Sequence, residues 1–273
     1  MNLITSYQTQ NSCYKSAKPA KQVGILVHST GANNPYLKRY VDNEEALGEN
    51  VYGNHWNQPG IEKCMHAFVG KDKNGNLATV ETLPYEYACW GCGNGQKGSF
   101  NYNPTAHIQF EICEDGLNDE SYFNAAFHEA AEYCAYLCKK FGFSVNDIVS
   151  HKEAASQGYA SNHGDCDFWL SKFGKDMGWF RGEVQKILNG GKKKMFEMVV
   201  NSVGVRVRTD LSFNGNRPTG KIITLAKPGQ AVRILEFVDG IQPDGYQWIK
   251  SEFNGAVGYS QYDSQCYWIR EVQ

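Results

Sequence analysis

The segment SHKEAASQGYASNHGDCDFW, residues 150–169, gathers two histidines, two aspartates and a cysteine in one polar stretch. Its small and polar residues predict a turn-rich segment. Imidazole nitrogen, thiolate and carboxylate oxygen are the ligands that zinc prefers, and a catalytic zinc takes three protein ligands and leaves a fourth position for water. We therefore expect this segment to supply two ligands, His151 and Asp165.

The third expected ligand, His28, follows the apolar run VGILV at residues 23–27. A short continuous apolar run is typical of a buried central strand. A strand terminus is also a rigid place to mount a ligand. Because His28 lies far from residues 150–169 in the sequence, the predicted zinc site is split between distant segments.

Another strand is predicted at HIQFEIC, residues 107–113. Its period of two places the apolar side chains on one face and His107, Gln109 and Glu111 on the other, toward the site. Partial desolvation raises the pKa of a glutamate toward neutrality while a nearby cation limits that rise, so Glu111 is a candidate general base. His107 remains an alternative to His28 as the third ligand.

The other segments of residues 1–188 alternate between strand and helix patterns. They are predicted strands at 64–69, 77–84 and 148–150, the first two joined by an Asn-Gly turn, and predicted helices from Asp119 to Gly142 and from about Met177. We expect residues 1–188 to form an α/β catalytic domain with a mixed central sheet flanked by helices.

Charge and cysteine usage narrow the class of protein. A formal net charge of −2 gives no reason to expect nucleic acid as a partner. The first 22 residues lack the pattern of an export signal, and no run approaches a membrane span, so we expect no membrane partner. Nine cysteines at irregular spacing do not form a disulfide framework, which favours a reducing compartment, and Cys134 and Cys138 are expected to pack in the core.

Three motifs in order, HST at 28–30, FEICED at 110–115 and the segment 150–169, resemble the zinc-dependent N-acetylmuramoyl-L-alanine amidases of type 2. The resemblance covers residues from about 20 to 185. It implies an enzyme that hydrolyses the amide bond between N-acetylmuramic acid and L-alanine, with bacterial peptidoglycan as its partner. Two alternatives stay open: a non-catalytic peptidoglycan-recognition protein of the same fold, and a zinc peptidase acting on the stem peptide.

The resemblance also implies a ligand set for Zn²⁺ of His28, His151 and Asp165. Cys166 is an alternative to Asp165, because some relatives use a cysteine in this turn. The spacing H-x-D at residues 163–165 favours Asp165.

The expected catalytic residues are Glu111 and His163. Glu111 matches the glutamate that accepts the water proton and passes it to the leaving amine. His163 stands two residues before Asp165, where relatives often carry lysine, and could stabilise the oxyanion. His66 lies on the predicted hairpin and is either a secondary residue of the cleft or a structural hairpin histidine. Gly91, in the segment CWGC, stands where a histidine is frequent in the W-H-C-G loop of the family.

Beyond residue 188 the composition changes. NGGKKK, residues 189–194, is typical of a linker. Residues 195–273 contain short strand patterns separated by Gly, Pro and Asp turns, which predict a small all-β barrel or sandwich. VGVRVRTDLSF at 203–213 and GAVGYS at 255–260 resemble the bacterial SH3-like domains of cell-wall hydrolases, which implies a cell-wall-binding domain.

This layout suggests a phage endolysin, made in the host bacterial cytoplasm without a signal peptide and acting at the cell wall after release. A bacterial autolysin is the alternative. Codons for Asn189, Gly190 and Gly191 can spell a ribosome-binding sequence ahead of Met195. An internal start there would give a separately translated C-terminal domain, whose association with the full-length enzyme would add wall-binding sites.

Overall fold

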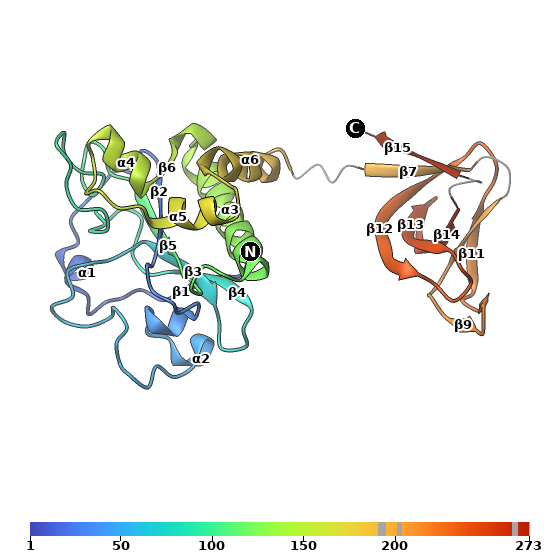
Figure 1. The fold of residues 1–273 in the computed structure, drawn as a ribbon, viewed down its shortest axis with the longest axis horizontal. Coiled ribbons are helices and arrows are strands. Elements are labelled where there is room, and N and C mark those ends of the chain that lie inside the picture. Colours follow the sequence, from blue (N-terminus) through green and yellow to red (C-terminus); the bar gives the residue numbers. More distant parts are fainter. Residues whose placement is uncertain (191–194, 201–203, 264–266, 273) are drawn as a thin grey trace. The chain divides into compact units, whose positions relative to one another are not determined.

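The computed structural model describes residues 1–190, 195–200, 204–263 and 267–272, in two compact units, Met1–Gly191 and Lys192–Gln273 (Figure 1). Most of the predicted linker, residues 191–194, lies outside the described residues. None of the described helices is long and apolar enough to cross a membrane.

A six-stranded mixed sheet forms the centre of the first unit (Figure 1). Its strands, in spatial order, are β1 (Leu3–Thr5), β4 (Leu77–Glu81), β3 (Ala67–Lys71), β5 (Ile108–Ile112), β2 (Ile25–Ser29) and β6 (Ile148–Ser150). All neighbours are parallel except the hairpin β3–β4. The predicted mixed α/β domain is confirmed. The predicted central strand, β2, lies between β5 and β6, and all five of its residues are buried, as expected for a parallel strand covered on both faces.

One face of the sheet is covered by the long helix α3 (Glu120–Phe141) together with α5 (Asp165–Lys172) and α6 (Met177–Leu188) (Figure 1). The Asp119 side chain accepts a hydrogen bond from the Tyr122 backbone N–H, a cap that typically stabilises a helix by about 1 kcal/mol. Gly142 ends the helix in the left-handed region, with φ of 76°. The predicted helix and both of its end residues are confirmed.

The opposite face carries the polar side chains of the central strands. Ile25 and Val27 pack toward α3, so Leu26 and His28 point to the other side. In the parallel register His28 pairs with Glu111 and Leu26 with Gln109. Part of this face is covered by loops and by three short helices, which are α1 (Ser12–Ser16), α2 (Glu44–Leu47) and the 3-10 helix Leu37–Arg39.

Residues 150–169 form helix α4 (His151–Gln157) and the start of α5, so the prediction of a turn-rich segment is wrong for most of this stretch. Ser150 and Glu153 form a capping box: each side chain accepts a hydrogen bond from the other residue's backbone N–H. Arg181 of α6 then binds both carboxylate oxygens of Glu153, at 2.9 and 3.0 Å. Helix α6 is thereby tied to the helix that begins with His151.

A disulfide joins Cys13 to Cys64. The expectation that the cysteines stay reduced is therefore wrong for this pair. Sequence spacing carried no signal, because the two residues are 51 positions apart. Cys134 and Cys138 are free and pack in the core beneath the sheet, as predicted.

The second unit is made of antiparallel strands, which confirms the all-β prediction. They are β7 (Met195–Val200), β8 (Val205–Arg208), β9 (Phe213–Asn214), β10 (Arg217–Pro218), β11 (Ile222–Ala226), β12 (Ala231–Ile241), β13 (Gln247–Phe253), β14 (Ala256–Tyr262) and β15 (Tyr267–Val272). Seven of them form one sheet in the order β11-β8-β14-β13-β12-β7-β15, and β9 pairs with β10. Alternating valine, isoleucine and methionine side chains form its core.

Candidate metal centre

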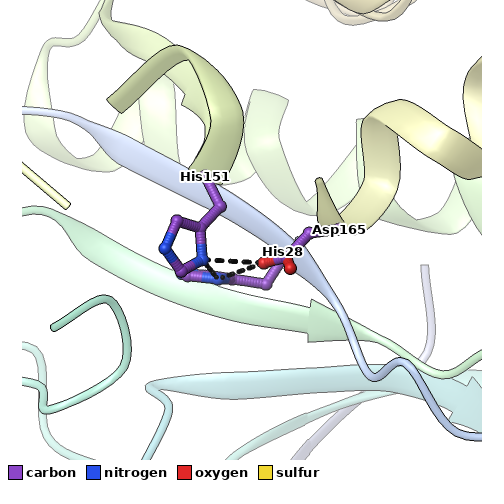
Figure 2. A group of neighbouring side chains, drawn as sticks. All are labelled: His28, His151 and Asp165. Atoms are coloured by element: carbon purple, nitrogen blue, oxygen red, sulfur yellow. Dashed lines mark hydrogen bonds and ion pairs between the residues drawn. The ribbon is translucent and has the colours of Figure 1, made fainter. Parts of the chain in front are cut away.

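Three side chains from three different elements converge on the polar face of the first unit (Figure 2). His28 lies on β2, His151 is the first residue of α4 and Asp165 is the first residue of α5. Asp165 Oδ2 is 3.0 Å from His28 Nδ1 and 2.8 Å from His151 Nδ1, and the two Nδ1 atoms are 3.0 Å apart. The fold brings together the three ligands expected from the sequence.

The donor set fits a divalent cation. Ligands at about 2.0–2.1 Å from a tetrahedral zinc lie roughly 3.3 Å from one another, close to the distances in this cluster. Burial lowers the pKa of His28 and favours its neutral form. Burial acts to raise the pKa of Asp165, but the adjacent rings of His151 and His28 outweigh it and hold that pKa below its ordinary value. Neutral imidazole and ionised carboxylate are the forms that bind a metal.

The backbone at the start of α5 selects Asp165 over its neighbour. Asp165 has φ of 37°, in the left-handed region that non-glycine residues rarely adopt. Such outliers cluster at functional sites, where the surrounding structure holds them in place. Cys166 points the other way, is fully buried in the core beneath the sheet and lies 3.7 Å from the Val27 carbonyl oxygen. Of these two residues, only Asp165 belongs to the cluster.

Glu111 lies beside the cluster on the neighbouring strand, in register with His28. It is 9% exposed, and its Oε2 atom is buried without a hydrogen-bond partner among the described residues. Burial, followed by the charges of Asp165 and Glu114, raises the pKa of Glu111 well above its ordinary value. A buried, unpartnered carboxyl oxygen with a raised pKa beside this cluster makes Glu111 a candidate functional group.

His163 lies on the solvent side of the cluster. Its side chain is 61% exposed, and its Nδ1 atom is 3.8 Å from Asp165 Oδ1. The ring stacks on that of His151, with centroids 4.9 Å apart and an interplanar angle of 12°. The imidazole therefore lies at the solvent-exposed edge of the cluster.

Two other histidines named from the sequence do not join the cluster. His107 stacks on Phe100, with ring centroids 3.9 Å apart, and its Nδ1–H donates to the Thr105 carbonyl, so it is not an alternative to His28. His66 is fully buried, and burial lowers its pKa to about 4. Its Nε2–H donates to the Tyr87 carbonyl and its Nδ1 accepts from the Gln109 backbone N–H, which is the bonding of a structural hairpin histidine.

Two residues that contact the ligands received no role from the sequence. Gln109 Oε1 is 3.1 Å from His28 Nε2, and Ser161 Oγ is 3.4 Å from His151 Nε2. A signal for Gln109 was present, because the period of two places it on the same face as Glu111. Ser161 lies in a loop after α4, where no periodic pattern applies.

Residues 18–166 match the family model described as N-acetylmuramoyl-L-alanine amidase. Similar solved structures include the hydrolase AmiA of Staphylococcus aureus in complex with its ligand, with 19% identity, coverage of 71% of this chain and 86% of that one, and a TM-score of 0.49. A mutant of PlyL has 17% identity, coverage of 68% and 99% and a TM-score of 0.48. The catalytic domain of XlyA has 18% identity, coverage of 67% and 99% and a TM-score of 0.47.

No curated protein matches the chain. The family model, by contrast, spans more than half of the 273 residues and includes all three residues of the cluster. The chain therefore belongs to the N-acetylmuramoyl-L-alanine amidase family.

Proposed function

We propose that His28, His151 and Asp165 hold the zinc ion of a peptidoglycan amidase that cleaves the bond between N-acetylmuramic acid and L-alanine. The observation that carries the proposal is the convergence of two imidazole nitrogens and one carboxylate oxygen within 3.0 Å of one another. Two nitrogens and one oxygen from the protein match a catalytic zinc site that keeps one position open.

Zinc in such a site supplies Lewis acidity, which polarises a carbonyl oxygen and lowers the pKa of water toward about 7. The residues of the chain supply proton transfer and orientation. Glu111, with its unpartnered Oε2, accepts the proton of the attacking water and passes it to the leaving amine. The exposed imidazole of His163 donates a hydrogen bond to the oxyanion that develops on the carbonyl oxygen.

Chelation is the direct test of this proposal. We expect a chelator to abolish the clearing of purified cell walls and added zinc to restore it, because the proposed reaction needs the Lewis acidity of the metal. Mass analysis of the released fragments should show stem peptides that begin with a free L-alanine amine. Cleavage inside the stem would indicate a zinc peptidase, binding without release would indicate a recognition protein, and clearing that resists chelation would contradict the zinc site.

We further propose that the second unit is an SH3-like barrel that binds the cell wall, and that the protein is an endolysin released from the host cytoplasm. The antiparallel topology and the strand sequences support the barrel. The internal start at Met195 and the association of its product with the full-length chain stay predictions. They depend on the codons of residues 189–191, which the protein sequence does not fix.

The wall-binding proposal predicts that residues 195–273 fused to a fluorescent protein label intact walls of the host. The reason is that this unit has its own buried core and strand network, so it should fold apart from the enzyme. Fluorescence microscopy with the unfused fluorescent protein as control measures the effect. A fusion that labels walls no better than the control would leave the second unit without a targeting role.

A further inference from the structure

We propose that Gln109 and Asn101 position the ligand His28 by fixing which of its ring nitrogens carries the proton. The inference rests on the zinc site proposed above and adds residues that do not touch the metal. Gln109 is fully buried and Asn101 is 5% exposed, so neither amide can turn to water for its hydrogen bonds. Metal-binding histidines generally need such a partner on the second ring nitrogen to hold the ring and its tautomer.

The orientation of the Asn101 amide is set by the backbone. Its Oδ1 atom accepts hydrogen bonds from the backbone N–H groups of Gly91, at 3.2 Å, and Cys92, at 3.1 Å. Only the oxygen of an amide side chain can accept, so the Asn101 oxygen must face this segment. The same oxygen lies 2.9 Å from Gln109 Nε2, and the Phe100 carbonyl lies 3.4 Å from that nitrogen.

The Gln109 amide is thereby fixed as well. Its NH₂ group faces two acceptors, so its Oε1 atom faces His28 Nε2 at 3.1 Å. Because a carbonyl oxygen can only accept, His28 Nε2 must carry the proton. The lone pair of the neutral ring is then on Nδ1, the atom that faces His151 and Asp165. Backbone groups therefore determine, through two amides, which nitrogen His28 offers to a metal.

A second connection reaches the other histidine of the cluster from the same residue, Cys92. Ser161 Oγ–H donates to the Cys92 carbonyl at 3.0 Å, which leaves the Ser161 oxygen free to accept from His151 Nε2–H at 3.4 Å. His151 Nδ1 then faces the cluster. The backbone of Cys92 thus orients both histidines, with its N–H acting through Asn101 and Gln109 and its carbonyl through Ser161.

Gly91 provides the space for this arrangement. A Cβ atom at position 91 would lie 2.5 Å from Gln109 Oε1 and 2.8 Å from the Met65 terminal methyl. Both distances are below any normal contact, so a side chain there would displace the Gln109 amide from His28. Gly91 and Gln109 therefore act together, because the space left by the missing side chain at position 91 holds the Gln109 amide beside His28.

The test compares Gln109→Leu and Gly91→Ala with the full-length protein, using Gln8→Leu as the matched control. Gln8 is also a buried glutamine, 2% exposed, but its Nε2–H donates to the Tyr40 carbonyl and not to a ligand. We expect zinc affinity, measured by competition with a chelating dye, to fall about 10- to 100-fold in both test variants and to stay unchanged in the control. The double variant should bind zinc no more weakly than the single variant with the lower zinc affinity, because both changes break the same hydrogen bond.

The second readout needs no metal. In the metal-free protein, nitrogen NMR shifts of the His28 ring should report a proton on Nε2 in wild type and a partial loss of that proton in Gln109→Leu and Gly91→Ala. An unchanged tautomer and unchanged zinc affinity in both variants would overturn the positioning role. Failure of wild type to bind zinc would instead overturn the proposed zinc site, while the tautomer measurement would still decide the role of Gln109.

Discussion

Asp165→Ala is expected to lose bound zinc and to reduce kcat/KM by at least about a thousandfold. The substitution removes the only carboxylate of the cluster and leaves two imidazole rings to hold a divalent cation. A catalytic metal typically contributes several kcal/mol to transition-state stabilisation, and each 1.36 kcal/mol corresponds to a factor of ten in rate. Elemental analysis of the purified variant and the rate of amine release from cell walls measure the two effects.

Cys166→Ser is the matched control for this prediction, because it changes the neighbouring candidate ligand. Its sulfur is buried in the core and faces the Val27 carbonyl, so we expect full zinc content and near-normal kcat/KM. A small loss of stability is expected, since a hydroxyl replaces a buried sulfur. Full zinc retention in Asp165→Ala together with zinc loss in Cys166→Ser would assign the ligand to Cys166 and contradict the geometry of the cluster.

Glu111→Gln is expected to lower kcat about 10²- to 10⁴-fold while zinc content stays at the wild-type level. An amide has nearly the shape of the carboxyl group but cannot accept the proton of the water, and general base catalysis typically contributes a factor of this size. The Oε2 atom has no hydrogen-bond partner among the described residues, so the substitution breaks no described hydrogen bond of that oxygen. Steady-state kinetics on soluble muropeptides, together with elemental analysis, separates loss of proton transfer from loss of metal.

Glu114→Gln is the control for Glu111. Glu114 is another buried carboxyl, but it already accepts a hydrogen bond from Ser29 Oγ at 2.5 Å. A glutamine oxygen can accept the same bond, so kcat should change by less than about tenfold. If Glu111→Gln retained wild-type kcat, or if the two variants lost activity equally, Glu111 would have no specific role as the base.

The features that the sequence predicted well depend on local patterns. The apolar spacing and the two end residues of α3 determine that helix without reference to the rest of the chain. The alternation in β5 places Glu111 and Gln109 on one face for the same reason. The three expected metal ligands were predicted by residue type and by family spacing, and the fold brings them together.

The features that the sequence did not predict depend on contacts between distant residues. The hydrogen bond from His28 to Gln109 across 81 positions and the separate environment of His107 depend on strand order and register. The Cys13–Cys64 disulfide joins α1 to the segment before β3. The helix α4 is a different case. Its capping box, Ser150 with Glu153, is a local signal, and the glycines and polar residues around it obscured the helix that it begins.

Helix α6 determines where the enzyme can be cut and joined to other domains. The family match ends at residue 166, before Met177–Leu188 begins. A chimaera joined at residue 166 would lack Phe180 and Val184 from the core, and Arg181 from the carboxylate of Glu153. It would therefore expose part of the core between the sheet and α3, and it would loosen α4, the helix that begins with His151. A portable first unit should therefore extend through Leu188, and exchange of the second unit belongs after that residue.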